Sequence, residues 1–250
     1  MFAENTREGK NDMEREIQRK YLECERMRIF LILMMGGGFM GAYTYLLKGG
    51  VFCNAQTSNI LLFGIALGNF DWNRAAYLLI PISAYLLGAI VSEILPVYVR
   101  KAGLLRWDTL LIGIEIVVLV ILGFLPDSVP EQVCQVSINF ICSMQYNTFR
   151  QAQGIPMATT FCTNHLRQTG IHIAIWLRKK EDKSLTRSQR HAEMLLSFAA
   201  GALAGAVACR MFGNRAIWGA AFLLLLAFID LLFADRTKEK GKLYQVPSGH

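Results

Sequence analysis

The chain alternates between long apolar runs and short polar or charged connections. Most of the runs approach the ~20 residues that a helix needs to cross a hydrocarbon layer of ~30 Å. Repeated runs of this length predict an all-α integral membrane protein. The eight apolar segments are 29–47, 57–69, 75–99, 103–125, 132–149, 157–177, 191–212 and 214–234.

Eight full crossings do not fit the distribution of charge. With a cytosolic amino terminus they would place Arg100, Lys101 and Arg106 outside, against the positive-inside rule. The second segment, 57–69, is also short, since a helix of that length covers only about 20 Å. We therefore expect segments one and two to make one net crossing through a broken or re-entrant element. Segments five and six should do the same, which gives about six net crossings.

With six crossings, the charges fit cytosolic placement of both termini. The acidic turn 126–131 falls outside, and the basic loop 178–190 falls inside. No signal peptide is expected, because residues 1–28 contain seven Lys/Arg and seven Asp/Glu. The expected parts are a charged cytosolic tail over residues 1–28, a membrane domain over residues 29–234 and a basic cytosolic tail over residues 235–250.

Two halves of the membrane domain, 29–125 and 132–234, would each make three net crossings and so enter from opposite sides. This predicts an inverted repeat, an arrangement found in transporters whose broken helices meet near the midplane. Gly154 and Pro156 separate the fifth and sixth segments. The glycines between Gly36 and Gly41 either interrupt the first segment or allow close helix packing of the small-xxx-small type.

Two polar motifs, within 49–64 and 142–170, lie at matching places in the two halves, with equivalent residues 106 positions apart. Polar groups cannot lie in hydrocarbon without partners, so they must pair, cap a half-helix or line a wet cavity. We expect Thr57 and Ser58 to cap a short helix that begins at Asn59, with 163–165 as the equivalent cap. The candidate substrate-binding residues are Asn54, Gln56, Thr57, Ser58, Asn59, Gln145, Asn147, Thr159, Thr160, Thr163, Asn164, His165 and Arg167.

Three kinds of ionisable side chain stand out in apolar surroundings. Glu115 lies near the middle of the fourth segment and is a candidate for proton coupling, either protonated or with a partner such as Arg167, Gln145 or Asn147. The alternative is a neutral, hydrogen-bonded acid that holds helices together. Arg167 is either a counter-charge for an anionic ligand or an interfacial side chain. His165 and His172 are two helical turns apart and share a face, which suits either proton transfer or hydrogen bonding.

Composition narrows the function classes. Hydrophobic residues make up 53% and charged residues 18%, below the ~25% of soluble domains. The net charge of +7 belongs to tails and loops beside apolar runs, so no nucleic-acid partner is expected. Cysteine spacing indicates neither a metal site nor a cofactor. Enzyme signatures are absent from the sequence, so we expect a protein that is not an enzyme.

The motifs resemble those of the YoaK-like family of bacterial inner-membrane proteins, a domain of unknown function. The resemblance rests on 54–59 (NAQTSN), on 144–150 and on 158–167 (ATTFCTNHLR). The chain departs from the family pattern at Ser58, where glycine is expected, and at 164–165, where Gly-Asn is expected. The resemblance implies a compact multi-span bundle in the plasma membrane.

We therefore predict a secondary transporter or permease for a small polar or anionic solute, with membrane lipids as its other partner. The alternative is a non-transporting scaffold, assembly factor or sensor whose polar motifs only cap and pack.

Overall fold

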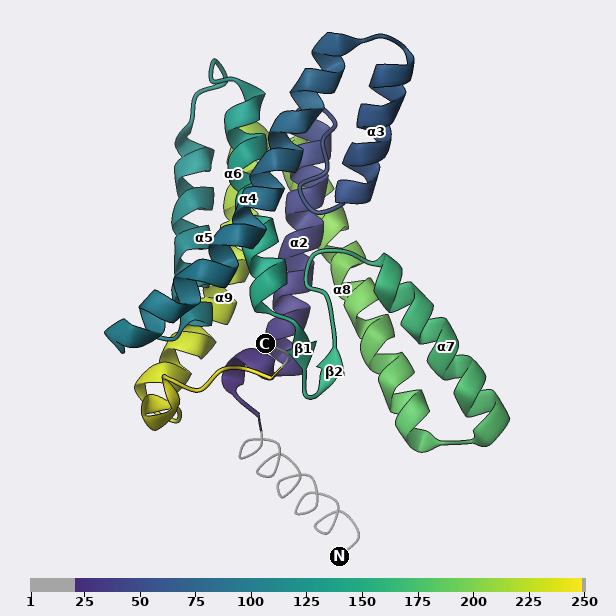
Figure 1. Ribbon diagram of the computed structural model, residues 1–250, viewed down its shortest axis with the longest axis vertical. Helices are drawn as coiled ribbons and strands as arrows, with labels where there is room; N and C mark the ends of the chain where they lie inside the picture. The colour runs from purple at the N-terminus through teal and green to yellow at the C-terminus, as the bar shows by residue number, and fades with distance from the viewer. Residues whose placement is uncertain (1–20, 249–250) are drawn as a thin grey trace, which may run out of the picture.

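The computed structural model describes residues 21–248 (Figure 1), which are almost entirely helical. The prediction of an all-α membrane fold is confirmed; most of the expected tail 1–28 lies outside the described residues. The helices are α2 (Met27–Leu47), α3 (Gln56–Gly68), α4 (Trp72–Ala102), α5 (Trp107–Phe124), α6 (Glu131–Thr148), α7 (Thr163–Lys179), α8 (Asp182–Phe212) and α9 (Ile217–Arg236). The shorter elements are η1 (Glu23–Glu25), β1 (Gln151–Ala152), β2 (Ile155–Pro156), η2 (Gly213–Ala216) and η3 (Lys240–Lys242).

Four helical stretches of the described chain are long and apolar enough to cross a membrane, by length and composition. They are Met27–Leu47, Trp72–Ala102, Trp107–Phe124 and Asp182–Arg236. The last of these contains two helices, α8 and α9, which η2 separates. α3 is apolar but has only 13 residues, and it falls in the expected broken element.

The long helices pack in three pairs: α2 along α8, α4 along α6, and α5 along α9. Each short helix packs against the long helix that follows it, α3 on α4 and α7 on α8. In Figure 1 these two short helices lie on the same side of the bundle but toward its two different ends. Every long pair therefore joins a helix from residues 27–124 to one from residues 131–236.

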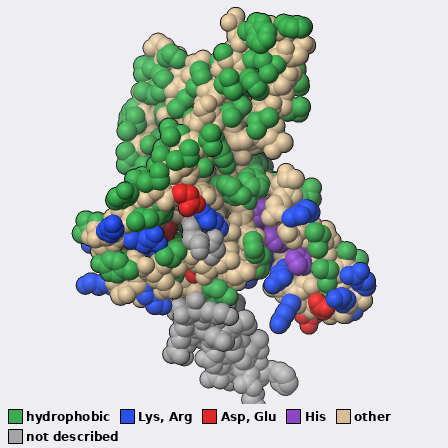
Figure 2. Space-filling view, in the orientation of Figure 1, with side chains coloured by type: hydrophobic (Ala, Val, Ile, Leu, Met, Phe, Trp, Pro, Cys, Tyr) green, Lys and Arg blue, Asp and Glu red, His purple; other side chains and the backbone are tan. Residues whose placement is uncertain are grey.

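Both ends of the described chain lie at one end of the bundle, which we call the terminal end. The Ser248 backbone N–H donates to Glu25 Oε1 (2.7 Å), and that of Glu23 donates to Glu239 Oε1 (2.7 Å). At the opposite end, Lys48 Nζ donates to Asn214 Oδ1 (2.6 Å). Figure 2 shows Lys and Arg side chains gathered toward the terminal end, with a largely apolar surface above them.

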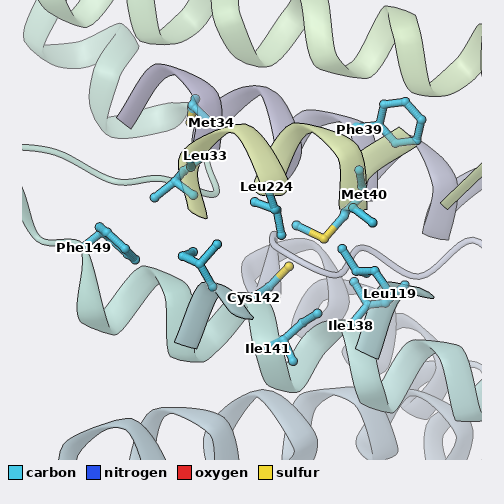
Figure 3. Close-up of a cluster of buried hydrophobic side chains, with 14 of the residues drawn as sticks. Leu33, Met34, Phe39, Met40, Leu119, Ile138, Ile141, Cys142, Phe149 and Leu224 are labelled. Atoms are coloured by element: carbon cyan, nitrogen blue, oxygen red, sulfur yellow. The ribbon is translucent and has the colours of Figure 1, made fainter. Parts of the chain in front are cut away.

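The core is built around α2, which is a continuous helix. Leu33, Met40, Cys142 and Leu224 lie in one buried cluster between α2, α6 and α9 (Figure 3). A Cβ at Gly38 would meet the Phe198 carbonyl oxygen of α8, so this glycine allows close helix contact. The α2 glycines therefore serve packing, and the alternative that they interrupt the helix is wrong.

Two helices do not begin where their apolar segments begin. The sixth apolar segment begins at 157, but α7 begins only at Thr163, within the expected cap region 163–165; the hairpin of β1 and β2 precedes it, and its turn residues, Gln153 and Gly154, both have positive φ. The seventh was expected from 191, but α8 begins at Asp182. Its extra turns bury Ser184 and Ser188 on the same face as His191, although residues 182–190 are too polar to be recognised as apolar.

Candidate functional site

The first break, residues 48–55, connects α2 to α3. Gly49 and Gly50 both have a φ of 67°, in the left-handed region that favours glycine, and they end α2. Asn59, fully buried in α3, hydrogen-bonds to both the backbone N–H and the backbone carbonyl of Phe52. Its Nδ2 donates to Phe52 O (2.7 Å), and its Oδ1 accepts from Phe52 N–H (3.1 Å). Asn59 therefore fixes the shape of the break through its own hydrogen bonds.

Amide side chains connect the first break to neighbouring helices. Asn54 Nδ2 donates to Gly37 O of α2 (3.0 Å). Gln56 Nε2 donates to Asn139 Oδ1 of α6 (2.7 Å), and Gln56 Oε1 accepts from Asn59 Nδ2 (3.1 Å). The predicted residues Asn54, Gln56 and Asn59 thus each hydrogen-bond to protein groups around the first break.

The predicted helix caps are wrong in both halves. α3 begins at Gln56, three residues before the expected start, with Ala55 at its N-cap position and no side-chain cap hydrogen bond. Thr57 is exposed and Ser58 is half-buried. α7 begins at Thr163 with Cys162 at its N-cap position, again without a side-chain cap. Side chains such as Asn59, which reach back to the break, organise these helix starts instead.

The second break, residues 149–162, leaves α6 through the β-hairpin and returns to the middle of the bundle. The hairpin is anchored at the terminal end, where Gln153 N–H donates to Glu25 O (2.8 Å). Beyond it, Thr159 and Thr160 are fully buried. A Cβ at Gly37 would lie 2.9 Å from Thr159 O, so this glycine of α2 lets the second break approach closely.

Both breaks consequently meet the same stretch of α2. The first break reaches Gly37 through Asn54, while the backbone of Thr159 and Thr160 rests against Gly37 itself. Asn54 also lies against Gly41, one helical turn further along. The glycine stretch therefore brings the two polar motifs, 106 residues apart in the chain, into one place.

Glu115 lies in the same central region. The Cys142 thiol of α6 lies beside the Cys53 thiol of the first break and close enough to Glu115 for an electrostatic interaction. The Tyr85 side chain of α4 lies next to both thiols and next to Thr160. The region therefore receives side chains from α4, α5, α6 and both breaks.

Several polar groups of this centre have no hydrogen-bond partner among the described residues. Both carboxyl oxygens of Glu115 and both amide atoms of Gln145 are in this condition, as is the hydroxyl of Thr159, whereas the Thr160 hydroxyl lies within hydrogen-bonding reach of the Tyr85 side chain of α4. All four residues have 0% exposure. Leaving one such neutral group unpaired costs about 1–3 kcal/mol, and a buried unpaired charge costs more. We call Glu115, Gln145, Thr159 and Thr160 the central cluster.

The other predicted residues lie away from the central cluster. Asn147 donates to Ser92 Oγ (2.8 Å) and to Glu93 Oε1 (2.9 Å). Thr163 and Arg167 are exposed and Asn164 is half-buried; Arg167 Nη2 donates to Asn164 Oδ1 (3.0 Å). None of the three partners expected for Glu115, which were Arg167, Gln145 and Asn147, is hydrogen-bonded to it in the described chain.

His165 is fully buried and occupied by protein partners. Its Nε2 lies 2.9 Å from Ala158 O, and its Nδ1 lies 2.9 Å from Nδ1 of His191 in α8. His172 stacks on the His191 ring, with 6.3 Å between ring centroids. The described residues contain no group of three His, Cys, Asp or Glu side chains arranged to hold a metal ion.

Sequence reasoning missed several residues that shape this region. Gln135, Asn139 and Cys142 share one face of α6, and their spacing of four and three residues was the available signal. Tyr85 and Cys53 gave no signal of their own. His191 contacts His165 across 26 positions of sequence, a pairing that helical periodicity does not indicate.

A second set of buried charged groups lies at the terminal end. Arg106 Nε is 3.1 Å from Asp108 Oδ1 and 3.9 Å from Asp235 Oδ1, and the Arg106 backbone N–H donates to Asp235 Oδ2 (3.1 Å). Burial alone would lower the pKa of the Arg106 guanidinium, but Asp108 and the neighbouring Cys24, Glu239 and Asp235 hold that pKa above its usual value. We call Arg106, Asp108 and Asp235 the terminal ion cluster.

The fold and its buried polar centre define a helical membrane protein with two chain breaks in its interior. The chain belongs to the family described as "Protein of unknown function (DUF1275)", which matches residues 29–229. No curated protein and no solved structure matches the chain.

Proposed function

We propose that the protein is a secondary transporter or permease for a small polar solute, and that the central cluster is its binding site. The observation that supports this proposal is a set of fully buried groups on Glu115, Gln145 and Thr159 that have no hydrogen-bond partner within residues 21–248, together with the fully buried Thr160. A scaffold has no use for groups that cost free energy when they stay unpaired, whereas a solute can supply their missing hydrogen bonds. The proposed activity is transport without bond cleavage.

The packing supports an inverted repeat as the framework of this transporter. α4 and α8 each have 31 residues, and the three long pairs each join one half to the other. Asn59 bonds to the carbonyl of Phe52, and His165 lies within hydrogen-bonding distance of the carbonyl of Ala158. Each contact spans seven positions, and the two contacts lie 106 positions apart. The halves therefore stabilise their breaks in equivalent ways.

The charge distribution supports placement in a bacterial plasma membrane with the terminal end in the cytosol. Basic side chains gather at this end (Figure 2), as the positive-inside rule requires. We also propose that the chain is YoaK-like within its family. Cysteines introduced singly at Trp72 and Ser128 should react with a membrane-impermeant reagent from outside, and one at Leu185 only from inside. Reaction of the Ser128→Cys protein from the cytosolic side alone would contradict this orientation.

The central cluster favours an uncharged or cationic solute. Its members offer a carboxyl group, an amide and two hydroxyls, and Arg167, the expected counter-charge for an anion, is exposed on α7. A carboxyl group buried without a cationic partner is neutral, so the cluster offers no positive charge to hold an anion. Arg167 therefore no longer supports the part of the sequence-based prediction that named an anionic solute.

A solute-library thermal-shift screen on the detergent-purified protein tests the binding site. Some small amines or neutral polar solutes should raise the unfolding temperature of the wild type, because a ligand that binds only the folded state stabilises it. The shift should disappear in Glu115→Gln and in Thr160→Val, and persist in Thr57→Ala, which changes an exposed predicted residue. A shift that survives both central substitutions would contradict the site.

The alternative, a scaffold, assembly factor or sensor, is favoured by one observation. Asn54, Gln56 and Asn59 all hydrogen-bond to protein groups, as expected for residues that only hold a break in shape. This alternative predicts that no solute stabilises the protein and that loss of these amides lowers its stability.

A further inference from the structure

Three histidines meet where α7 packs on α8, beside the second break. His165 and His191 have 0% and 2% exposure, and their Nδ1 atoms are 2.9 Å apart. His172, two turns along α7, stacks almost parallel to His191, with 5° between the ring planes. Its Nδ1 is buried without a hydrogen-bond partner in the described chain. Figure 2 shows the histidines grouped on this part of the molecule.

The contacts of His165 fix where the protons lie. The Ala158 carbonyl oxygen can only accept, so Nε2 of His165, at 2.9 Å, carries the hydrogen. A neutral imidazole has one N–H, so Nδ1 of His165 is an acceptor. His191 must then donate from its Nδ1. The Nε2 atom of His191 makes no hydrogen bond within residues 21–248, so its lone pair is where a proton would bind.

The hydrogen bond between the two rings can survive one added proton but not two. Protonation of His191 at Nε2 leaves its Nδ1–H donating to His165, now from a charged donor. Protonation of His165 as well would direct two N–H groups at each other across the 2.9 Å contact. The second proton therefore breaks the hydrogen bond that holds the first turn of α7 against α8.

The charged neighbours of the pair make a buried positive charge unfavourable. Arg187 of α8 acts on both His172 and His191. Glu193, the nearest acid along α8, pairs with Arg190 (3.0 Å), and Arg167 of α7 is bonded to Asn164. α2, which packs along α8, has no charged residue from Ile29 to Leu47. Charged imidazoles are therefore stabilised only where they reach water.

We propose that His165 and His191 form a proton-binding site whose protonation releases the second break, and that the proton is the coupling ion of the transporter. The coupling role rests on the proposed transport function. His165 is bonded to Ala158, the residue directly before Thr159 and Thr160. Movement of His165 toward water therefore pulls on the segment that supplies two members of the central cluster. Acid favours the released arrangement, since that arrangement binds more protons.

The native thiol of Cys162 reports this movement. It is the N-cap residue of α7 and is half-buried, whereas the other five cysteines are buried. The rate of maleimide reaction is measured between about pH 8 and about pH 5.5, the range in which histidine titrates. Cys162→Ser gives the background from the buried thiols. Because thiolate formation itself depends on pH, the wild-type reaction rate at each pH is divided by the rate of a histidine variant at the same pH.

His165→Asn is the matched control, since asparagine at the equivalent position, Asn59, already bonds to the equivalent carbonyl. It should keep the break closed and remove the titration. His191→Gln is the second variant, because its amide can still donate to His165. We expect the wild-type rate, relative to either variant, to rise at least about three-fold on acidification, as an opening equilibrium shifts.

A ratio that stays constant with pH would overturn the proton-binding site, whatever the protein transports. In that case the rates of the variants rise as the wild-type rate does, and the histidines are not the groups that titrate. If the ratio rises but no solute is taken up by proteoliposomes, the proton-dependent contact stands and the transport function and its coupling fail. Thermal unfolding at about pH 8 shows that each variant is folded.

Discussion

The terminal ion cluster and the central cluster both bury charged or polar side chains, but only the first pairs them. Arg106 contacts Asp108 and Asp235, and its guanidinium also lies near the Cys24 sulfur (3.3 Å). Glu115, equally buried, has two oxygens without a hydrogen bond in the described chain. A buried side chain that is paired within the protein can hold segments together, whereas a buried side chain without a protein partner is available to bind a ligand.

The location of each cluster agrees with this difference. The terminal ion cluster joins the start of α5 to the end of α9, and Arg106 Nη1 also donates to Lys242 O (3.4 Å). Thr159 and Thr160 of the central cluster lie where the second break reaches the glycine stretch of α2, and the side chains of Glu115 and Gln145 make no hydrogen bond in the described chain. Removing a partner should therefore damage stability at the terminal end and function at the centre.

The largest expected effect is that of Arg106→Met. Loss of the guanidinium would leave Asp108 and Asp235 buried without their cation, which typically costs about 3–5 kcal/mol. Urea or thermal unfolding in detergent measures the change. Lys101→Met, an exposed residue nearby in the chain, is the control and should change stability by less than about 0.5 kcal/mol. An Arg106→Met protein as stable as the control would show that the pairing does not hold the two segments together.

A smaller effect is expected from Gly37→Ala. The new methyl group would lie 2.9 Å from Thr159 O and 3.3 Å from Thr160 Cα, so the second break must shift. Overpacking of this kind costs about 1–3 kcal/mol. Gly64→Ala is the matched control: a Cβ there meets no atom within 4 Å, and the substitution should be neutral or slightly stabilising. Equal stability of the two variants would argue against close contact between α2 and the second break.

The smallest effect on stability is expected from Glu115→Gln. No hydrogen bond is lost and the side chain keeps its shape, so the free energy of unfolding should change by less than about 1 kcal/mol. The measurement is the same unfolding experiment at neutral pH. A loss as large as that of Arg106→Met would mean that Glu115 has a structural partner, and the contrast between the two clusters would collapse.

The sequence was sufficient for the helical membrane fold and for the position of both breaks. Apolar length and charge distribution carry that information, and they also predicted that Glu115 is buried. Local chemistry was less informative at the helix starts. Thr57 and Ser58 have suitable cap side chains, but Gln56 bonds to Asn139 of α6, so α3 begins earlier than expected.

The parts that escaped prediction depend on contacts between distant segments. The polar start of α8 is helical because His191 and two serines are buried there, and no apolar run marks that face. The glycines of α2 left two alternatives open, and only the positions of Phe198 and Thr159 decide between them. Arg167 matches the motif of a binding residue, yet its place on α7 points it outward.

Uptake into proteoliposomes tests the central claim most directly. Wild type, Glu115→Gln and Thr57→Ala are reconstituted in equal amounts, and the solutes that stabilise the wild type are supplied in labelled form. We predict that the wild type and Thr57→Ala accumulate solute and that Glu115→Gln, although folded, loses at least about ten-fold in rate, or about 1.4 kcal/mol. Equal uptake by Glu115→Gln and the wild type would contradict the assignment of the central cluster as the transport site.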